Sequence, residues 1–334
     1  MIGKKLLEVA RKVVKENMGL YYNERAYIIT DRGSRQRAAI AKALLKASKE
    51  IASDSFMEVM PETGGDGTEP PEEISHNMLD ADILLMPTTY SLSHTAARKA
   101  ASGMGVRWAS MPHITKDMFL RTLSLDYRAE VVPVTNYVAR KVRHAERVKI
   151  RTAAGTDFTV YRTGRTVHED NGIYTGKGSG GNLPAGEAFF APNEGKSYGK
   201  IVVDGGISQM GKLKEPLTIE VEGGMVKSLS GSRADELKRI LMPEKLGDKV
   251  YNIAELGIGT NKQAVGFETA LEGEKILGTC HVALGNNTGF GGGVSVPLHI
   301  DMVIKNPTIS FESGFVLMEN GALQGFQELA ASSV

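Results

Sequence analysis

Apolar residues in the first part of the chain follow two spacings that alternate along the sequence. Leu6, Val9, Ala10 and Val13 recur at helical spacing, and Ala26 begins a short apolar run of the strand type. Further strands are predicted at 56–60 and 82–86, and further helices at 34–47, 71–79, 93–101 and 133–144. Strand and helix segments that alternate in this way predict a parallel sheet with helices on its faces.

From about residue 146 the pattern changes to short strands separated by glycine and asparagine turns. Eight of the 38 glycines lie in residues 1–150, which leaves 30 in residues 151–334. The strand-like runs are 148–152, 158–161, 200–204, 217–221 and 226–229, with one helix at 232–241. We therefore expect an α/β protein with a parallel-sheet α/β domain at residues 1–146. A mainly β (α+β) domain should follow at residues 147–334.

Composition and charge narrow the classes of partner. The chain is 41% hydrophobic and 24% charged, as is typical of globular proteins, and its net charge of +1 gives no electrostatic reason to expect nucleic acid or an anionic membrane. A single cysteine, Cys280, excludes an intramolecular disulfide framework. No stretch approaches the ~20 apolar residues of a membrane span, and the N-terminus lacks the apolar core of a signal peptide. These features predict a cytoplasmic protein that binds neither nucleic acid nor membranes.

Five residues of the C-terminal half carry the side chains that divalent metals prefer. They are Glu187, Glu255, His281, His299 and Asp301. The run 296–304 reads as a strand, and because side chains alternate along a strand, His299 and Asp301 share one face. His281 lies in the apolar run 275–284, where an imidazole needs a polar partner or a metal. Imidazole and carboxylate suit zinc-like ions, and two histidines with one carboxylate are also the ligands of non-haem iron.

Simpler interpretations stay open for each of these residues. His299 and Asp301 can form an exposed ion pair, and Glu187 can be an exposed turn residue. Glu255 lies among apolar neighbours, so we expect it to be buried with a cation, an arginine or a metal beside it. The remaining histidines apart from His94 are isolated, and most are expected at the surface: His76, His113, His144 and His168.

Four segments of the C-terminal half resemble the aminopeptidases of family M29, the thermophilic metalloproteases. They read NLPAGEAFFAP, AELGIGTN, KILGTCHVALGNN and HIDMVIKNPT, in the family's order. The resemblance implies an N-terminal α/β domain, a catalytic C-terminal domain, a homodimer and a dinuclear zinc or cobalt centre. The metal ligands would be Glu187, Glu255, His281, His299 and Asp301. One departure is Thr288, which stands where the family's peptidases have a tyrosine ligand.

Ring-cleaving dioxygenases of the 2,5-dihydroxypyridine type are similar to the M29 enzymes but hold a single Fe(II) with two histidines and an aspartate. In this chain those ligands would be His281, His299 and Asp301. The dioxygenases also use a histidine of the N-terminal domain as acid–base catalyst, which would be His94.

The residues around His94 offer a physical reason for such a role. If Ser91 or Ser93 caps a helix, His94 lies in its first turn, where the helix dipole would keep the imidazole neutral. Arg98 would lie one turn further along the same face and is a candidate for binding a substrate carboxylate or phenolate.

These observations favour a metal-dependent aminopeptidase that hydrolyses short peptides with a metal-activated water. Glu255 or Glu187 would be its general base. The alternative is a mononuclear Fe(II) dioxygenase that cleaves a hydroxylated aromatic or pyridine ring, with His94 as acid–base catalyst. A third hypothesis is a non-catalytic binding protein with a structural metal. The number and identity of the bound metal ions discriminate between the first two.

Overall fold

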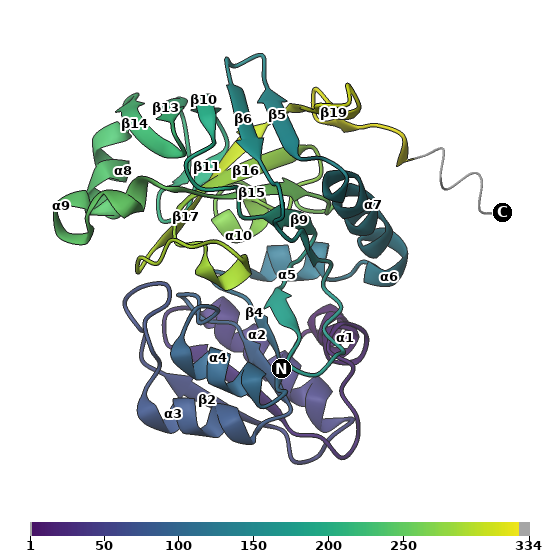
Figure 1. Cartoon of the computed structure of the whole chain (residues 1–334). Helices are drawn as coiled ribbons and strands as arrows, with labels where there is room; N and C mark the ends of the chain where they lie inside the picture. Colours follow the sequence, from purple (N-terminus) through teal and green to yellow (C-terminus); the bar gives the residue numbers. More distant parts are fainter. Residues whose placement is uncertain (1, 327–334) are drawn as a thin grey trace. The chain divides into compact units, whose positions relative to one another are not determined.

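A computed structural model describes residues 2–326 of the chain, which divides into two compact units (Figure 1). The first unit contains residues 1–132 and 170–185, and the second contains residues 133–169 and 186–334. The division therefore differs from a single boundary at residue 146. The chain leaves the first unit at the first residue of the helix α7 (Val132–Arg143) and returns to it once, at residues 170–185.

The first unit is built on a five-stranded sheet in the order β2-β1-β3-β4-β8. Every neighbouring pair runs parallel, as the alternating pattern predicts. The strands are β1 (Ala26–Asp31), β2 (Phe56–Met60), β3 (Ile83–Met86), β4 (Arg107–Ser110) and β8 (Gly180–Asn182). β8 is supplied by the returning segment, and Gly180 lies so close to Trp108 of β4 that a Cβ there would be 2.4 Å from the indole.

Helices accompany the strands of the first unit and enclose an apolar core. Its helices are α1 (Lys4–Lys12), α2 (Arg35–Lys49), α3 (Glu72–Asn77), α4 (Ala96–Gly103), α5 (Lys116–Thr122) and α6 (Tyr127–Glu130). Ser34 caps α2 as predicted, because its hydroxyl accepts a hydrogen bond from the backbone N–H of Gln36. Tyr27 and Ile29 of β1 and Leu84 and Met86 of β3 are completely buried in the core.

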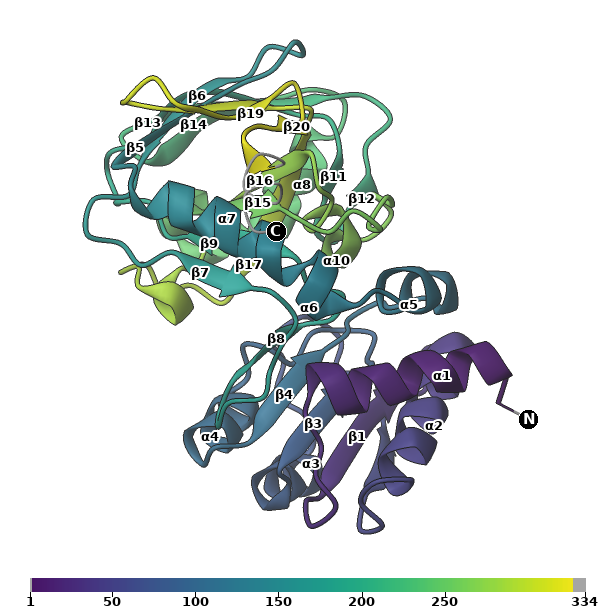
Figure 2. The ribbon, with the colours of Figure 1, turned by 90° about the vertical axis from the view of Figure 1, so that its right-hand side faces the viewer.

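The second unit is mainly β, as expected, and contains two antiparallel sheets. The eight-stranded sheet has the order β14-β13-β10-β6-β5-β18-β19-β20. Its strands are β5 (Arg147–Arg151), β6 (Asp157–Tyr161), β10 (Tyr198–Val203), β13 (Leu217–Glu222), β14 (Met225–Ser230), β18 (Thr308–Phe311), β19 (Val316–Glu319) and β20 (Ala322–Leu323). Figure 2 shows β5, β6, β13 and β14 in one layer of this unit.

The seven-stranded sheet has the order β12-β11-β17-β16-β15-β9-β7. Its strands are β7 (His168–Asp170), β9 (Glu187–Phe190), β11 (Gly206–Ile207), β12 (Gly211–Lys212), β15 (Ile253–Gly259), β16 (Thr279–Gly285) and β17 (His299–Lys305). The helices of this unit are α7, α8 (Ala234–Leu241), α9 (Pro243–Leu246) and α10 (Ala270–Gly273). One apolar core joins residues of both sheets with residues of α7 and α8.

Alternation divides the central strands of the seven-stranded sheet into two faces. Val282 of β16 and Ile300 and Met302 of β17 belong to the apolar core. The residues between them, such as His281 and Asp301, therefore stand on the opposite face. We call this second face the polar face of the sheet. His299 and Asp301 both lie on it, which confirms the prediction from strand alternation.

Two predicted strands begin later than their apolar runs. β17 starts at His299 and not at residue 296, and Pro297, which has no N–H for a ladder, lies in the part that is not strand. β16 starts at Thr279 and not at residue 275, because Gly278 has a φ of +99° that only glycine adopts easily. Within residues 2–326, no helix has the length and apolar character needed to cross a membrane.

Candidate metal centre

The register of β9, β15, β16 and β17 brings all five predicted ligands to the polar face. Glu255 pairs with Ala283, which pairs in turn with Asp301, so only a methyl side chain stands between the two acids. Gly257 pairs with His281, and a Cβ on Gly257 would lie 2.1 Å from the imidazole. Small residues at these positions thus leave room for large polar side chains to meet.

Glu255 lies at the centre of the group. Its Oε1 is 3.3 Å from His281 Nε2, and its Oε2 is 3.3 Å from His299 Nε2. His281 Nε2 also lies 3.5 Å from Glu187 Oε2, and His299 Nε2 lies 3.2 Å from Asp301 Oδ1. All five side chains are at most 16% exposed. The prediction that Glu255 is buried is confirmed, and the polar groups beside its carboxylate are the two imidazoles. Glu187 is not an exposed turn residue.

Hydrogen bonds behind the cluster orient His299 and Asp301. His299 Nδ1 lies 2.8 Å from the carbonyl oxygen of Asn286, which can only accept, so Nδ1 carries a proton. In a neutral ring, Nε2 then presents its lone pair to Glu255 and Asp301. The hydroxyl of Ser208 accepts from the N–H of Asp301 at 3.1 Å and lies 3.3 Å from Asp301 Oδ2. Partners of this kind hold metal ligands in a fixed orientation.

The concentration of acids changes the protonation of the histidines. Burial lowers the pKa of His281, but the hydrogen bond with Glu255 and the charges of Glu187 and Glu255 outweigh it and raise the pKa to about 9. Burial also opposes the charge of His299, yet Asp301 and Glu255 raise its pKa well above its ordinary value. Although burial acts to raise the pKa of Glu255, the two imidazoles hold it below its usual range. The buried carboxylates of the cluster therefore stabilise positive charge beside them, which protons on the imidazoles or a metal ion can supply.

Two further residues of the cluster, Lys275 and Glu274, are not among those that the sequence predicts. The Lys275 ammonium lies 2.5 Å from Glu187 Oε1 and 2.9 Å from Glu274 Oε1. Burial raises the pKa of Glu274, although the charge of Lys275 opposes the shift. The sequence signal for both residues is their position at the start of the apolar run before His281, where charged side chains need partners.

Aromatic side chains lie beside His299. Phe290 meets the His299 ring edge-on, with centroids 5.8 Å apart, and meets Phe189 in the same way at 5.6 Å. His168 stacks on Phe189 at 5.2 Å and, through Nε2, lies 3.2 Å from the Phe290 carbonyl oxygen. All three are half-buried, and we call Phe189, Phe290 and His168 the aromatic group. His168 is thus not isolated, whereas the other three histidines expected at the surface are exposed.

The donor set fits one or two divalent ions. Three groups of residues place their ligand atoms within 4.8 Å of one another: Glu187, Glu255 and His281; Glu255, His299 and Asp301; Glu274, His281 and Asp301. Each group combines imidazole and carboxylate, which suits zinc, cobalt and ferrous iron. Thr288 is exposed, and its hydroxyl donates to Asn286 Oδ1 at 2.9 Å.

The prediction that His94 lies in the first turn of a helix is wrong. α4 begins at Ala96 and is capped by Thr95, whose hydroxyl accepts from the N–H of Arg98. The N–H groups of the first turn also bind the carboxylate of Glu69, so the helix dipole acts on an acid and not on an imidazole. His94 is exposed and precedes the helix.

Arg98 is already engaged within the first unit. Its guanidinium stacks over the Trp108 ring at 4.5 Å, and its Nε donates to the Ser93 carbonyl oxygen at 2.6 Å. Burial lowers the pKa of Arg98 to about 10. Its predicted contact with a substrate stays a prediction, as does the acid–base role of His94.

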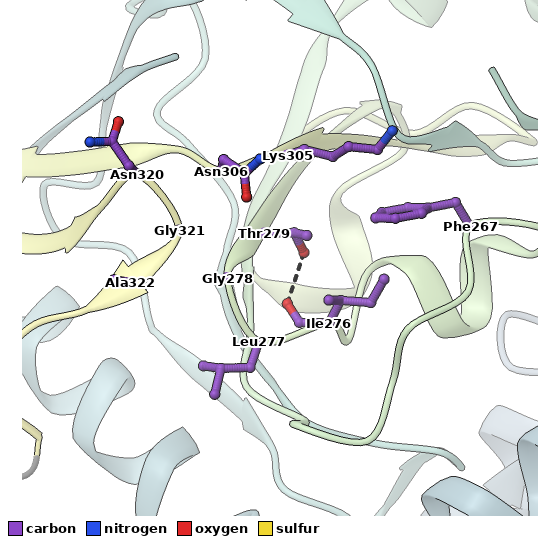
Figure 3. A pocket seen from close by; sticks show the side chains of 10 residues that line it. All are labelled: Phe267, Ile276, Leu277, Gly278, Thr279, Lys305, Asn306, Asn320, Gly321 and Ala322. Atoms are coloured by element: carbon purple, nitrogen blue, oxygen red, sulfur yellow. Dashed lines mark hydrogen bonds between the residues drawn. The ribbon is translucent and has the colours of Figure 1, made fainter. Parts of the chain in front are cut away.

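A pocket of about 540 Å³ lies elsewhere in the second unit and contains none of the predicted ligands (Figure 3). It adjoins the start of β16 and the end of β17, where the Lys305 ammonium stands 4.7 Å from the centre of the Phe267 ring. The pocket therefore lies at the Lys305 end of β17, whereas His299 is at the other end of the strand.

Comparisons with known proteins place these features in context. The model of the family described as 2,5-dihydroxypyridine 5,6-dioxygenase matches residues 6–325. A curated 2,5-dihydroxypyridine 5,6-dioxygenase from Pseudomonas putida KT2440 is 25% identical over 189 residues, which are 53% of this chain and 54% of that protein. The match thus spans about half the length of this curated relative.

Two solved structures share the fold over nearly the whole chain. The 2,5-dihydroxypyridine dioxygenase from Pseudomonas putida KT2440 superposes with a TM-score of 0.81 at 18% identity, covering 96% of this chain and 97% of that one. Wild-type AmpT from Thermus thermophilus superposes with a TM-score of 0.72 at 16% identity, covering 96% and 99%. The predicted fold class is confirmed by these two structures.

Proposed function

Because the chain belongs to the 2,5-dihydroxypyridine 5,6-dioxygenase family, we propose that it is an iron(II)-dependent dioxygenase that cleaves a hydroxylated aromatic or pyridine ring. This is the alternative of the two enzyme hypotheses from sequence, and the family match favours it over the aminopeptidase.

His281, His299 and Asp301 are the residues that would hold the metal. His281 Nε2 lies 3.3 Å from Glu255 Oε1, and His299 Nε2 lies 3.3 Å from Glu255 Oε2, so the two imidazoles flank one carboxylate. Asp301 adds a carboxylate oxygen 3.2 Å from His299 Nε2. When bound, a ferrous ion would supply the one-electron chemistry that ring cleavage by dioxygen requires. The hydrogen bond from His299 Nδ1 to Asn286 keeps the ring in the orientation that ligation needs.

The observation that favours ring cleavage is the aromatic group, which lies beside His299. The half-buried Phe290 ring lies edge-on to the His299 imidazole with centroids 5.8 Å apart, and the half-buried Phe189 ring packs on Phe290 at 5.6 Å. A planar ring packs favourably against such surfaces in stacked or edge-on geometry, worth roughly 0.5–1.5 kcal/mol for each contact. His168 adds a polar edge next to these rings. This surface is suited to orienting a flat substrate next to the metal.

The test is oxygen uptake by protein that has been reconstituted with Fe(II) without air. We expect consumption of dioxygen and loss of ring absorbance when 2,5-dihydroxypyridine is added, and neither when Asp301→Ala is used. Phe290→Leu should raise KM for the ring with little change in kcat, because it removes a packing surface and no ligand. Absence of uptake by the iron-loaded wild type, together with release of N-terminal residues from peptides, would contradict the proposal.

Aminopeptidase activity is the second candidate, and one observation favours it. Glu255 joins two half-sites, one with Glu187 and His281 and the other with His299 and Asp301. A carboxylate in that position suits two ions about 3.5–4 Å apart. Elemental analysis that finds two zinc or cobalt ions per chain, with peptide hydrolysis, would support this candidate.

A further inference from the structure

Lys275 is the buried lysine of the described chain, with no exposure of its side chain. Lysine is almost never fully buried unless its ammonium is paired, because removing that charge from water is costly. Its position beside the candidate metal centre therefore needs an explanation in terms of charge.

The ammonium contacts one end of the cluster. It lies 2.5 Å from Glu187 Oε1, while Glu187 Oε2 faces His281 Nε2 at 3.5 Å. A second carboxylate, that of Glu274, lies 2.9 Å from the same ammonium. At the other end of the cluster, Asp301 contacts His299 and the hydroxyl of Ser208. A lysine ammonium is thus built into the Glu187 end of the cluster.

The backbone fixes Lys275 in this position. Its N–H donates to the carbonyl oxygen of Glu272 at 3.1 Å, and its own carbonyl oxygen accepts from the N–H of Asn261 at 2.8 Å. Gly259 of β15 allows the segment to approach closely, since a Cβ there would lie 2.2 Å from the carbonyl oxygen of Ile276. Lys275 therefore lies in a short segment whose backbone N–H and carbonyl groups are both hydrogen-bonded, and not in a surface loop.

We propose that Lys275 takes the place of a second metal ion at the Glu187 end, so that the centre binds one divalent ion, ligated by His299 and Asp301 together with His281. The ammonium occupies an oxygen of Glu187 and repels a further cation, since like charges a few ångströms apart in a buried site interact strongly. The proposal rests on the proposed function only in requiring a bound metal. It makes Lys275 the residue that determines metal number.

The experiment counts metal ions and does not depend on turnover. Metal-free protein is equilibrated with excess Co(II) without air, freed of unbound ion, and analysed for cobalt per chain. We expect one ion in the wild type and two in Lys275→Met, a twofold rise. The double variant Lys275→Met, Glu187→Gln should return to one ion, because the second site loses its carboxylate. Lys305→Met is the matched control on β17, outside the cluster, and should bind one ion.

Two ions in the wild type, or one ion in folded Lys275→Met, would overturn the inference. If metal-free Lys275→Met does not fold, it is prepared in Co(II), where we expect the second ion to replace the lost charge and restore folding. Failure to recover folded Lys275→Met with two ions from the Co(II) preparation also counts against the inference. A wild type that binds no ion overturns the proposed function as well, whereas one ion in both forms overturns this inference alone.

Discussion

The two faces of the seven-stranded sheet are made by the same strands and differ in what they bury. On β16 and β17, Val282, Ile300 and Met302 enter the apolar core. On the polar face, one residue away along each strand, stand His281 and Asp301. Both sets are shielded from water, yet one is apolar and the other consists of charges that must balance.

The difference separates stability from chemistry. A fully buried apolar side chain contributes roughly 1.5–3 kcal/mol to folding. Removing an ion from water costs several kcal/mol, and pairing with an opposite charge offsets only part of that cost. Replacing a buried ion pair with apolar residues is therefore often neutral or stabilising. The polar face is therefore hard to explain by stability, and a metal centre would account for it. Changes on the two faces should have separable effects.

The largest effect is expected from His299→Ala. Loss of an imidazole ligand should remove the metal and lower turnover by on the order of 10³-fold or more, because several kcal/mol of charge stabilisation is lost. Metal content and initial rate measure it. A variant that keeps its metal and an unaffected rate would refute the metal-centre assignment.

Ile300→Ala tests the apolar face one residue away. It should lower the free energy of unfolding by about 2–5 kcal/mol through lost burial and a cavity. The metal bound per folded chain should stay unchanged, since His299 and Asp301 keep their strand. Urea denaturation and cobalt analysis measure the two quantities, and a fall in both would show that the faces are not separable.

The pH dependence of the metal-free protein tests the charge balance of the polar face. Since the pKa of His281 is raised to about 9 in the folded state, its contribution is fully present below about pH 6.5 and is lost as pH rises through about 9. Glu274, whose pKa burial raises, acts in the same direction. We expect His281 alone to account for a loss of roughly 3 kcal/mol between pH 6.5 and 9.5, measured by urea denaturation. Stability that is flat or rising over this range would contradict the charge balance.

The smallest of these effects is expected from Gly257→Ala. The added methyl would meet the imidazole of His281 at 2.1 Å, so the ring must shift. Displacing one ligand should weaken metal binding about 10–100-fold, as changes in the support of metal ligands do. Competition with a chelator measures the affinity, and Ala283→Gly is the control that adds no bulk. An unchanged affinity would show that His281 is not a ligand.

Local pattern predicted the placement of the candidate ligands better than it predicted the residues around them. Alternation along β17 placed His299 and Asp301 together, and apolar neighbours predicted that Glu255 is buried. The contacts of Lys275 with Glu187 join residues 88 positions apart, and no local spacing records them. The helix start near His94 was misplaced because Thr95 and the distant Glu69 both satisfy the first turn of α4.

The sequence by itself determined the alternating elements, the parallel and antiparallel sheets and the residues that can ligate a metal, because these follow from side-chain periodicity and chemistry. The tertiary structure alone decided the order of the strands, the return of residues 170–185 to the first sheet and the charge at each end of the centre. Lys275 shows the reason: a charge acts on its neighbours in space, and only folding makes Glu187 and Glu274 its neighbours.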